Sequence, residues 1–123
     1  MWTETSGQYR QLVDDGTRAD LEQLRSAVAA EVKGLEADLH AVFEASQDSN
    51  ADDEHDPEGN TIAYERAQLT AVLSATRRRL TDIDEALARL DAGVYGICER
   101  CGRPIPADRL AIRPFARTCV TCA

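Results

Sequence analysis

The sequence predicts an all-α dominated fold, in which a long antiparallel coiled-coil helical hairpin is followed by a small C-terminal module that holds four cysteines. Three observations support this prediction: two long segments with a helical apolar period, a turn-rich polar segment between them, and two Cys-x-x-Cys pairs near the end. Aromatic residues make up only 5% of the 123 residues, while Ala, Leu, Arg, Asp and Glu dominate. This composition is typical of long helices rather than of a sheet core.

The first long helix is expected to begin at Thr17, after a flexible N-terminal tail at residues 1–16 that has no sustained apolar period. Thr17 and Asp20 resemble a capping box. The helix then runs to about Ser46 with one apolar face, because its large aliphatic residues recur at spacings of three, four and seven. These residues are Leu21, Leu24, Val28, Leu35, Leu39 and Val42.

The polar segment at about residues 47–60 is expected to be an acidic loop. It is crowded with turn formers and ends in the sequence DPEG, so the first helix cannot pass through it. A second helix, capped by Asn60 or Thr61, then shows clear heptads and ends before Gly93. One seam position takes Ile62, Leu69, Thr76, Ile83 and Leu90, and the other takes Leu73, Leu80 and Leu87, with Arg66 as the exception.

Two such helices joined by a short loop most simply fold back on each other. This gives a coiled-coil hairpin over residues 17–92 with the loop at its tip, and we expect it to be a monomer. The alternative is that the second helix pairs with a parallel copy of itself and leaves the first helix outside the pair.

The C-terminal module, at residues 93–123, contains Cys98 and Cys101 as one pair and Cys119 and Cys122 as another, with 17 residues between the pairs. This spacing is typical of a tetrahedral site in which four thiolates hold one structural zinc ion. So short a segment buries too little apolar surface to fold unaided, and a metal supplies the missing free energy. Two disulfides are the alternative, but they require an oxidising compartment.

The residues around the cysteines fit a zinc knuckle. Gly102 follows Cys101 directly, and a positive φ at that position would let backbone amides point at the sulfurs. The apolar residues of the module are expected to form a small core on one side of the metal. They are Val94, Tyr95, Ile97, Ile105, Leu110, Ile112, Phe115 and Val120.

The formal net charge is −8 at pH 7, and it is unevenly spread. Residues 44–58 hold seven acids and no Lys or Arg, whereas residues 98–123 hold five Arg and two acids. An acidic chain argues against general nucleic-acid binding, which depends on phosphate neutralisation, and favours a protein partner with a basic groove. Direct sequence-specific DNA recognition is therefore not expected.

Several other classes are disfavoured. No Ser-His-Asp set, phosphate-binding loop or carboxylate pair at a defined spacing occurs, so the sequence does not predict an enzyme. The chain has no run of about eighteen apolar residues, and its start lacks the basic and apolar regions of a signal peptide. We therefore expect a cytoplasmic protein without a membrane segment.

The finger follows the pattern G-x-Y-G-x-C-x-x-C-G, then R-L-x-x-x-P, then C-x-x-C. This order, after a hairpin with an acidic tip, resembles the C4-type zinc-finger proteins of the DksA/TraR family, and the resemblance extends over residues 17–123. The matching residues are Gly93, Tyr95, Gly96, Cys98, Cys101, Gly102, Ile105, Arg109, Leu110, Pro114, Cys119 and Cys122.

The resemblance implies a transcription regulator that binds RNA polymerase directly, inserts its coiled coil into the secondary channel and modulates initiation, often together with guanosine tetraphosphate. The family's tip motif, D-x-x-D-x-A, places its first acid on Asp56. The position of the motif's second Asp is then occupied by Gly59, and the position of its Ala is occupied by Thr61. Glu58 is therefore the acid expected to substitute for the missing Asp. Of the basic residues that bind the nucleotide in the family, one has a clear counterpart in this sequence, and that counterpart is Arg113.

Two further functions remain open on the residues alone. The runner-up is a zinc-capped coiled-coil adaptor that joins other proteins and does not act on RNA polymerase. Nucleic-acid binding through the Arg-rich finger is weaker, because no aromatic stacking platform accompanies its five Arg. Co-purification with RNA polymerase, and its loss on competition by a secondary-channel cleavage factor, would separate the first function from the other two.

Overall fold

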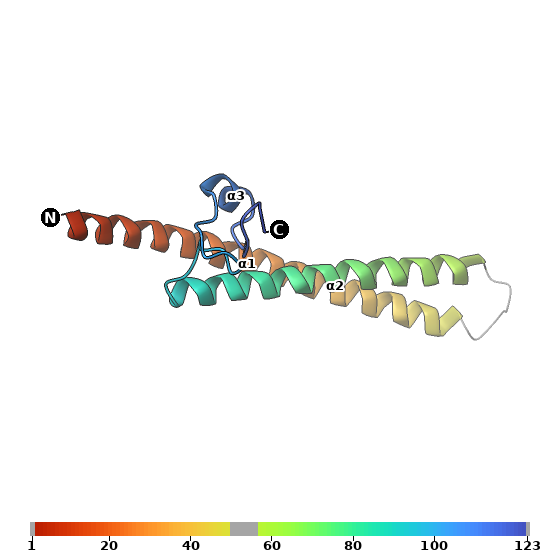
Figure 1. Cartoon of the computed structure of the whole chain (residues 1–123). Coiled ribbons are helices and arrows are strands. Elements are labelled where there is room, and N and C mark those ends of the chain that lie inside the picture. The colour runs from red at the N-terminus through yellow and green to blue at the C-terminus, as the bar shows by residue number, and fades with distance from the viewer. Residues whose placement is uncertain (1, 50–56, 123) are drawn as a thin grey trace. The chain divides into compact units, whose positions relative to one another are not determined.

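The computed structural model describes residues 2–49 and 57–122, with side chains placed at residues 15–47 and 61–122. The described chain forms α1 (Trp2–Ser49), α2 (Pro57–Asp91) and the short α3 (Ala107–Ile112) (Figure 1). Within these ranges there is no strand, and one isolated antiparallel bridge joins Ile97 to Pro104. No helix among the described residues has both the length and the apolar character that crossing a bilayer requires.

The chain divides into two compact units, which we call the finger unit (residues 1–26 and 80–123) and the hairpin unit (residues 27–79). Each unit contains a stretch of α1 packed against a stretch of α2. The partners across these helices run in opposite order along the chain, so the helices are antiparallel. The ion pairs that show this are Arg18–Asp91 at 2.6 Å and Arg25–Asp84 at 2.5 Å in the finger unit, and Glu36–Arg77 at 3.0 Å in the hairpin unit.

The predicted antiparallel helical hairpin is therefore confirmed, and α2 pairs with α1 of its own chain. The seam carries the predicted apolar residues. Those that are buried are Leu21, Val28, Leu73, Thr76, Ile83 and Leu90. Val32 and Ala86, which were not among the predicted seam residues, are buried as well. The Thr76 hydroxyl donates a hydrogen bond to the Val72 carbonyl oxygen at 2.7 Å, so a polar side chain is accommodated inside the seam.

Arg66, the exception among the seam positions, is explained by an aromatic partner. Its guanidinium carbon lies over the Phe43 ring, 5.3 Å from the ring centroid, and both residues belong to the hairpin unit. A guanidinium in this position is attracted by the negative face of the ring while its long stem covers apolar surface. Arg66 is half-buried as a result.

The ends of the long helices differ from the predicted ones. α1 begins at Trp2 rather than Thr17. Residues 2–16 have no apolar period, so the sequence pattern did not predict a helix there. They also contain no proline that would stop a helix. α1 continues to Ser49 and α2 begins at Pro57, so the loop predicted at 47–60 was too long. Proline is favoured in the first turn of a helix, where its missing N–H would have no partner.

The end of α2 was predicted correctly at Gly93, which has a φ of 75°. The Gly93 amide donates to the Leu90 carbonyl at 3.2 Å, and the Val94 amide donates to the Arg89 carbonyl at 3.0 Å. These two bonds form a Schellman motif, which satisfies the last carbonyls of the helix and turns the chain sharply. The finger therefore begins at a fixed position against the end of α2.

Candidate metal centre

The four cysteines converge at one point of the finger unit. Cys98 and Cys101 lie in the turn that follows α2, and Cys119 and Cys122 lie in the turn that follows α3. Their sulfur atoms all lie within 4.8 Å of one another, and the Sγ atoms of Cys101 and Cys119 are 3.7 Å apart. All four are free thiols, so the disulfide alternative does not describe this arrangement.

The sulfur cluster fits a zinc ion. Zinc binds thiolate sulfur at about 2.3 Å, and four sulfurs at the corners of a tetrahedron of that radius are about 3.8 Å apart. The 3.7 Å separation between the Cys101 and Cys119 sulfurs agrees with this value. Four soft thiolates are also the ligand set that zinc prefers in structural sites, and they leave no coordination position for a substrate.

Backbone geometry at the first pair is that of a knuckle. Gly102 has the positive φ that was predicted, 73°. Its amide donates to the Cys98 carbonyl at 3.0 Å, and the Cys98 amide donates to the Arg103 carbonyl at 2.8 Å. The turn thereby closes around the sulfurs without a strained side chain, because glycine has no Cβ.

The thiols do not ionise alike. Backbone amides, first that of Cys101 and then that of Cys119, donate to the Cys98 sulfur and lower its pKa to about 6. The Cys122 thiol donates to the Cys119 and Cys98 sulfurs, which raises its pKa to about 12. The protein therefore stabilises thiolate at one edge of the cluster, while four thiolates together require the positive charge of a metal.

The core of the finger is smaller than predicted. It consists of Cys98, Ile105 and Cys119, with Leu110 and Cys122 packed against it. Half of the predicted core residues are exposed instead: Val94 (44%), Ile97 (41%), Ile112 (83%) and Val120 (66%). The prediction was wrong for these residues because the cysteines themselves occupy the interior, and so few residues around one metal have only a small interior to fill.

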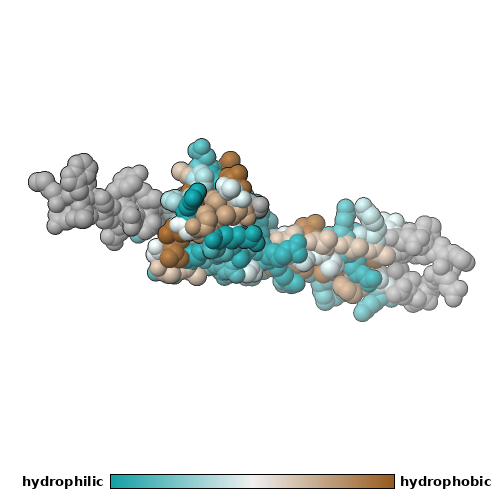
Figure 2. Space-filling view, viewed as in Figure 1, coloured by the Kyte–Doolittle hydropathy of each residue, from teal (hydrophilic) through white to brown (hydrophobic). Residues whose placement is uncertain are grey.

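Two arginines attach the finger to α2, and the sequence did not reveal them as functional. Arg117 pairs with Asp82 at 2.6 Å and also with Glu85. Arg89 lies within 3.6 Å of Glu99. Figure 2 shows a band of hydrophilic side chains along the part of α2 beside the finger. The sequence did contain one signal for this contact: Asp82 and Glu85 are three residues apart, so they lie on one face of the helix and together favour a basic partner.

Arg113, the predicted nucleotide-binding residue, lines a cleft of about 330 Å³ in the finger unit. Its guanidinium carbon lies 5.6 Å from the centroid of the Phe115 ring. Arg100, Arg109 and Arg117 line the same cleft, and so do the acids Asp82 and Glu99. Arg117 already pairs with acids of α2, so the cleft is less positive than its count of arginines suggests.

The predicted tip residues are not described in full. Asp56 lies outside the described residues. Glu58 belongs to the first turn of α2 rather than to the predicted loop, and its side chain lies outside the described part of the chain. Their role at the tip therefore stays a prediction.

A four-thiolate cluster attached to an antiparallel helical hairpin defines a C4-type zinc-finger protein. A family model described as "Prokaryotic dksA/traR C4-type zinc finger" matches residues 93–123. A solved structure, described as "Structure of transcription factor DksA2 from Pseudomonas aeruginosa", matches with a TM-score of 0.73 and 28% sequence identity, over 89% of this chain and 78% of that one. The chain belongs to the DksA/TraR family.

Individual relatives match parts of the chain. An uncharacterized protein of Aquifex aeolicus is 52% identical over 62 residues, which is 50% of this chain and 43% of the relative. The RNA polymerase-binding transcription factor DksA of Caulobacter vibrioides is 48% identical over 40 residues, which is 32% of this chain and 28% of that factor. The chain thus spans less than half the length of either relative.

Proposed function

We propose that this protein is a non-enzymatic transcription regulator that binds RNA polymerase directly and inserts the end of its hairpin into the secondary channel to modulate initiation. The observation that carries the proposal is the similarity to DksA2, which covers 89% of the chain and so includes helical hairpin as well as finger. The Caulobacter relative that is 48% identical over 40 residues is a factor that binds RNA polymerase. Such a regulator works in the cytoplasm as a monomer.

The hairpin unit suits entry into a narrow channel. Its α1 stretch, residues 27–49, is about 35 Å long at about 1.5 Å per residue, and two packed helices are about 20 Å across. The acids of residues 44–58 are concentrated at the end where α1 stops and α2 starts. Negative charge at that end favours a basic channel that surrounds a catalytic Mg²⁺ ion.

We assign one structural zinc ion to Cys98, Cys101, Cys119 and Cys122. When bound, the ion supplies the folding free energy of the finger by cross-linking its two turns. The chain's own contribution is to hold the sulfurs in a tetrahedral arrangement and to direct backbone amides at them. The finger then presents its exposed apolar residues, among them Ile112 and Val120, as a fixed surface for the polymerase.

Guanosine tetraphosphate is the proposed small-molecule partner, with Arg113 as its binding residue. Arg113 is exposed in the cleft and pairs with no acid among the described ion pairs, so its guanidinium can meet a phosphate. Asp82 and Glu99 oppose an anion there, and we therefore expect nucleotide binding to the free protein to be weak. Arg113→Ala should remove any binding measured by calorimetry, with Arg103→Ala as the control from the same finger.

The direct test is binding to purified core RNA polymerase. We expect a stable complex that a secondary-channel cleavage factor displaces in proportion to its concentration. A complex that forms but resists this competitor would place the protein elsewhere on the enzyme. The absence of any complex, with zinc-loaded protein, would favour the adaptor function over the proposed one.

A further inference from the structure

The segment that leads from α3 to the second cysteine pair is held by its carbonyl groups. We call residues 113–118 the strap. Five consecutive strap carbonyls, at residues 114–118, accept hydrogen bonds from other parts of the finger unit. The Tyr95 hydroxyl donates to the Pro114 carbonyl at 2.7 Å, and the Arg89 guanidinium donates to the carbonyls of Phe115 at 3.5 Å and Ala116 at 3.3 Å. The Glu99 amide donates to the Arg117 carbonyl at 3.0 Å, and Arg109 Nε donates to the Thr118 carbonyl at 2.9 Å.

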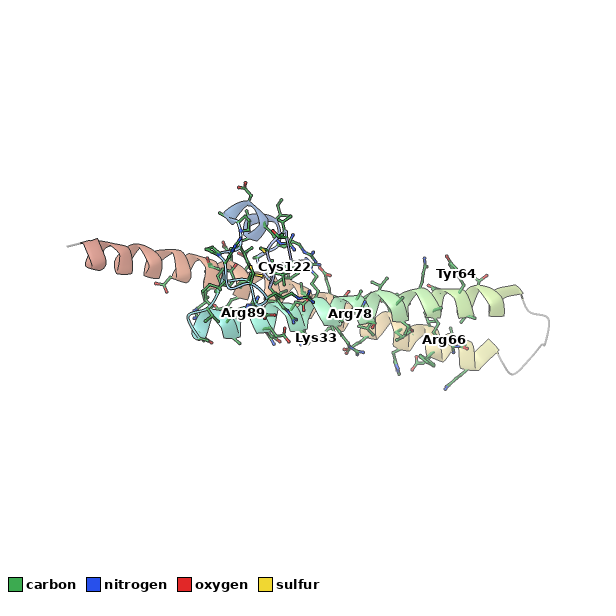
Figure 3. The ribbon with its side chains drawn as sticks, viewed as in Figure 1. Lys33, Tyr64, Arg66, Arg78, Arg89 and Cys122 are labelled. Atoms are coloured by element: carbon green, nitrogen blue, oxygen red, sulfur yellow. The ribbon has the colours of Figure 1, made fainter. Side chains whose placement is uncertain are left out.

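Arg89 has a special place among these donors because it contacts both halves of the metal centre. It lies in the last turn of α2 (Figure 3). One guanidinium nitrogen donates to the strap carbonyls that precede Cys119, and another lies 3.6 Å from the carboxylate of Glu99, which sits between Cys98 and Cys101. A single side chain thus connects the two cysteine pairs.

The Arg89 side chain is only 12% exposed, so its contacts matter energetically. A guanidinium removed from water needs partners for its donors, and its flat, rigid fork meets several acceptors at once. Phe115, Ala116 and Glu99 supply these partners only when the strap and the first knuckle are both in position. The arrangement of the two cysteine pairs and the burial of Arg89 therefore depend on each other.

We propose that Arg89 is a positioning residue for the metal centre, which holds the two cysteine pairs at the separation that a zinc ion requires. It acts through Glu99 and the strap backbone rather than as a ligand. Residues that do not bind a metal but orient its ligands typically raise the affinity of the protein for that metal by about 10–100-fold. The inference rests on the zinc assignment and is independent of any polymerase.

The test compares the zinc affinity of the full-length protein in the wild type, Arg89→Met and Arg117→Met, by competition with a chromophoric chelator. Arg117 is the matched control, because its side chain also joins the finger to α2, through Asp82 and Glu85, but among the described residues it forms no ion pair with Glu99 and donates to no strap carbonyl. We expect zinc affinity to fall about 10–100-fold in Arg89→Met and by less than about 3-fold in Arg117→Met. Both variants are expected to lower the melting temperature of the zinc-loaded protein.

Arg89→Lys provides the second variant, in case Arg89→Met fails to fold. Lysine keeps the charge and the aliphatic stem, but its compact ammonium cannot reach Glu99 and both strap carbonyls together. We expect its zinc affinity to lie between those of the wild type and Arg89→Met, with the helix signal unchanged. Wild-type affinity in the Lys variant, or equal losses in Arg89→Met and Arg117→Met, would overturn the proposal. A wild-type protein that binds no zinc would instead overturn the metal assignment itself.

Discussion

Cys98 and Cys119 have two roles at once, since each offers a sulfur to the cluster and each forms part of the small core around Ile105. Metal ligation and apolar packing therefore cannot be separated in the finger. In the hairpin unit the opposite holds, because Val28 and Leu73 are buried in a seam that contains no metal ligand. The two units are expected to respond differently to metal removal.

The first prediction tests this difference. Cys98→Ser should abolish zinc binding and unfold the finger, while far-UV circular dichroism retains most of the helix signal of α1 and α2. Zinc content is measured by elemental analysis after dialysis. Val120→Ser, in the second Cys-x-x-Cys pair but 66% exposed, is the control and should keep its zinc. Loss of the whole helix signal in Cys98→Ser would show that the hairpin depends on the metal.

Gly34 and Gly102 allow a second prediction about the backbone. A Cβ added at either position meets nothing within 4 Å, so only conformation distinguishes them. Gly34 lies within α1, where alanine is preferred, and Gly34→Ala should stabilise the protein by about 0.5–1 kcal/mol. Gly102 has a φ of 73°, and Gly102→Ala should destabilise it by about 1–2 kcal/mol. Denaturant titration with zinc present measures both, and effects of the same sign would contradict the assigned φ.

At the scale of the elements, the long helices α1 and α2 hold most of the buried apolar residues of the described chain. Their most completely buried positions are occupied by Leu21, Val28, Ile83 and Ala86, each with no exposed area. Leu80 and Leu87, which share the heptad seam, are only half-buried. Burial thus concentrates at a subset of the heptad positions.

Ile83→Ala provides the third prediction. Truncation of a fully buried isoleucine loses its transfer free energy and leaves a cavity, so the free energy of unfolding should fall by about 2–5 kcal/mol. Ile112→Ala is the matched control, because Ile112 is 83% exposed and the change should cost less than about 0.5 kcal/mol. Equal effects in thermal or urea unfolding would contradict the packing described for α2.

The sequence predicted the elements whose signal is periodic or chemical. The heptads predicted α2 and its seam, and the cysteine spacing predicted the metal site, because each of these signals lies in a local sequence pattern. The start of α1 could not be predicted, since residues 2–16 have no stripe. The six-residue α3 and the exposure of Ile112 depend on tertiary contacts within the finger, as does the role of Arg89, whose partners lie 10 or more positions away along the chain.

For the whole molecule, charge is the property that links fold to function. Acids dominate residues 44–58, whereas arginines dominate the finger, within a net charge of −8. Several finger arginines are already engaged, since Arg117 pairs with acids of α2 and Arg109 donates to the Thr118 carbonyl. Residues 44–58 contain no Lys or Arg, and Glu44 pairs with His40 at 3.0 Å, so the other acids of this segment carry the negative charge that a basic partner would meet.

The central claim is that the acidic end of the hairpin acts inside the polymerase. Asp56→Asn combined with Glu58→Gln removes two negative charges there and keeps side-chain size. Affinity for RNA polymerase should stay nearly unchanged, because in the proposed complex the hairpin flanks and the finger supply most of the contact area. Glu31→Gln combined with Asp38→Asn, at exposed positions of α1 in the hairpin unit, is the control that removes the same charge elsewhere.

The decisive measurement is the lifetime of the open promoter complex, at a promoter that responds to the wild-type protein, with each variant at saturating concentration. The account predicts that the Asp56→Asn, Glu58→Gln protein binds polymerase but no longer changes this lifetime, while the Glu31→Gln, Asp38→Asn control acts like the wild type. An unchanged effect on the lifetime in the tip variant would contradict the claim that the acidic tip takes part in the mechanism.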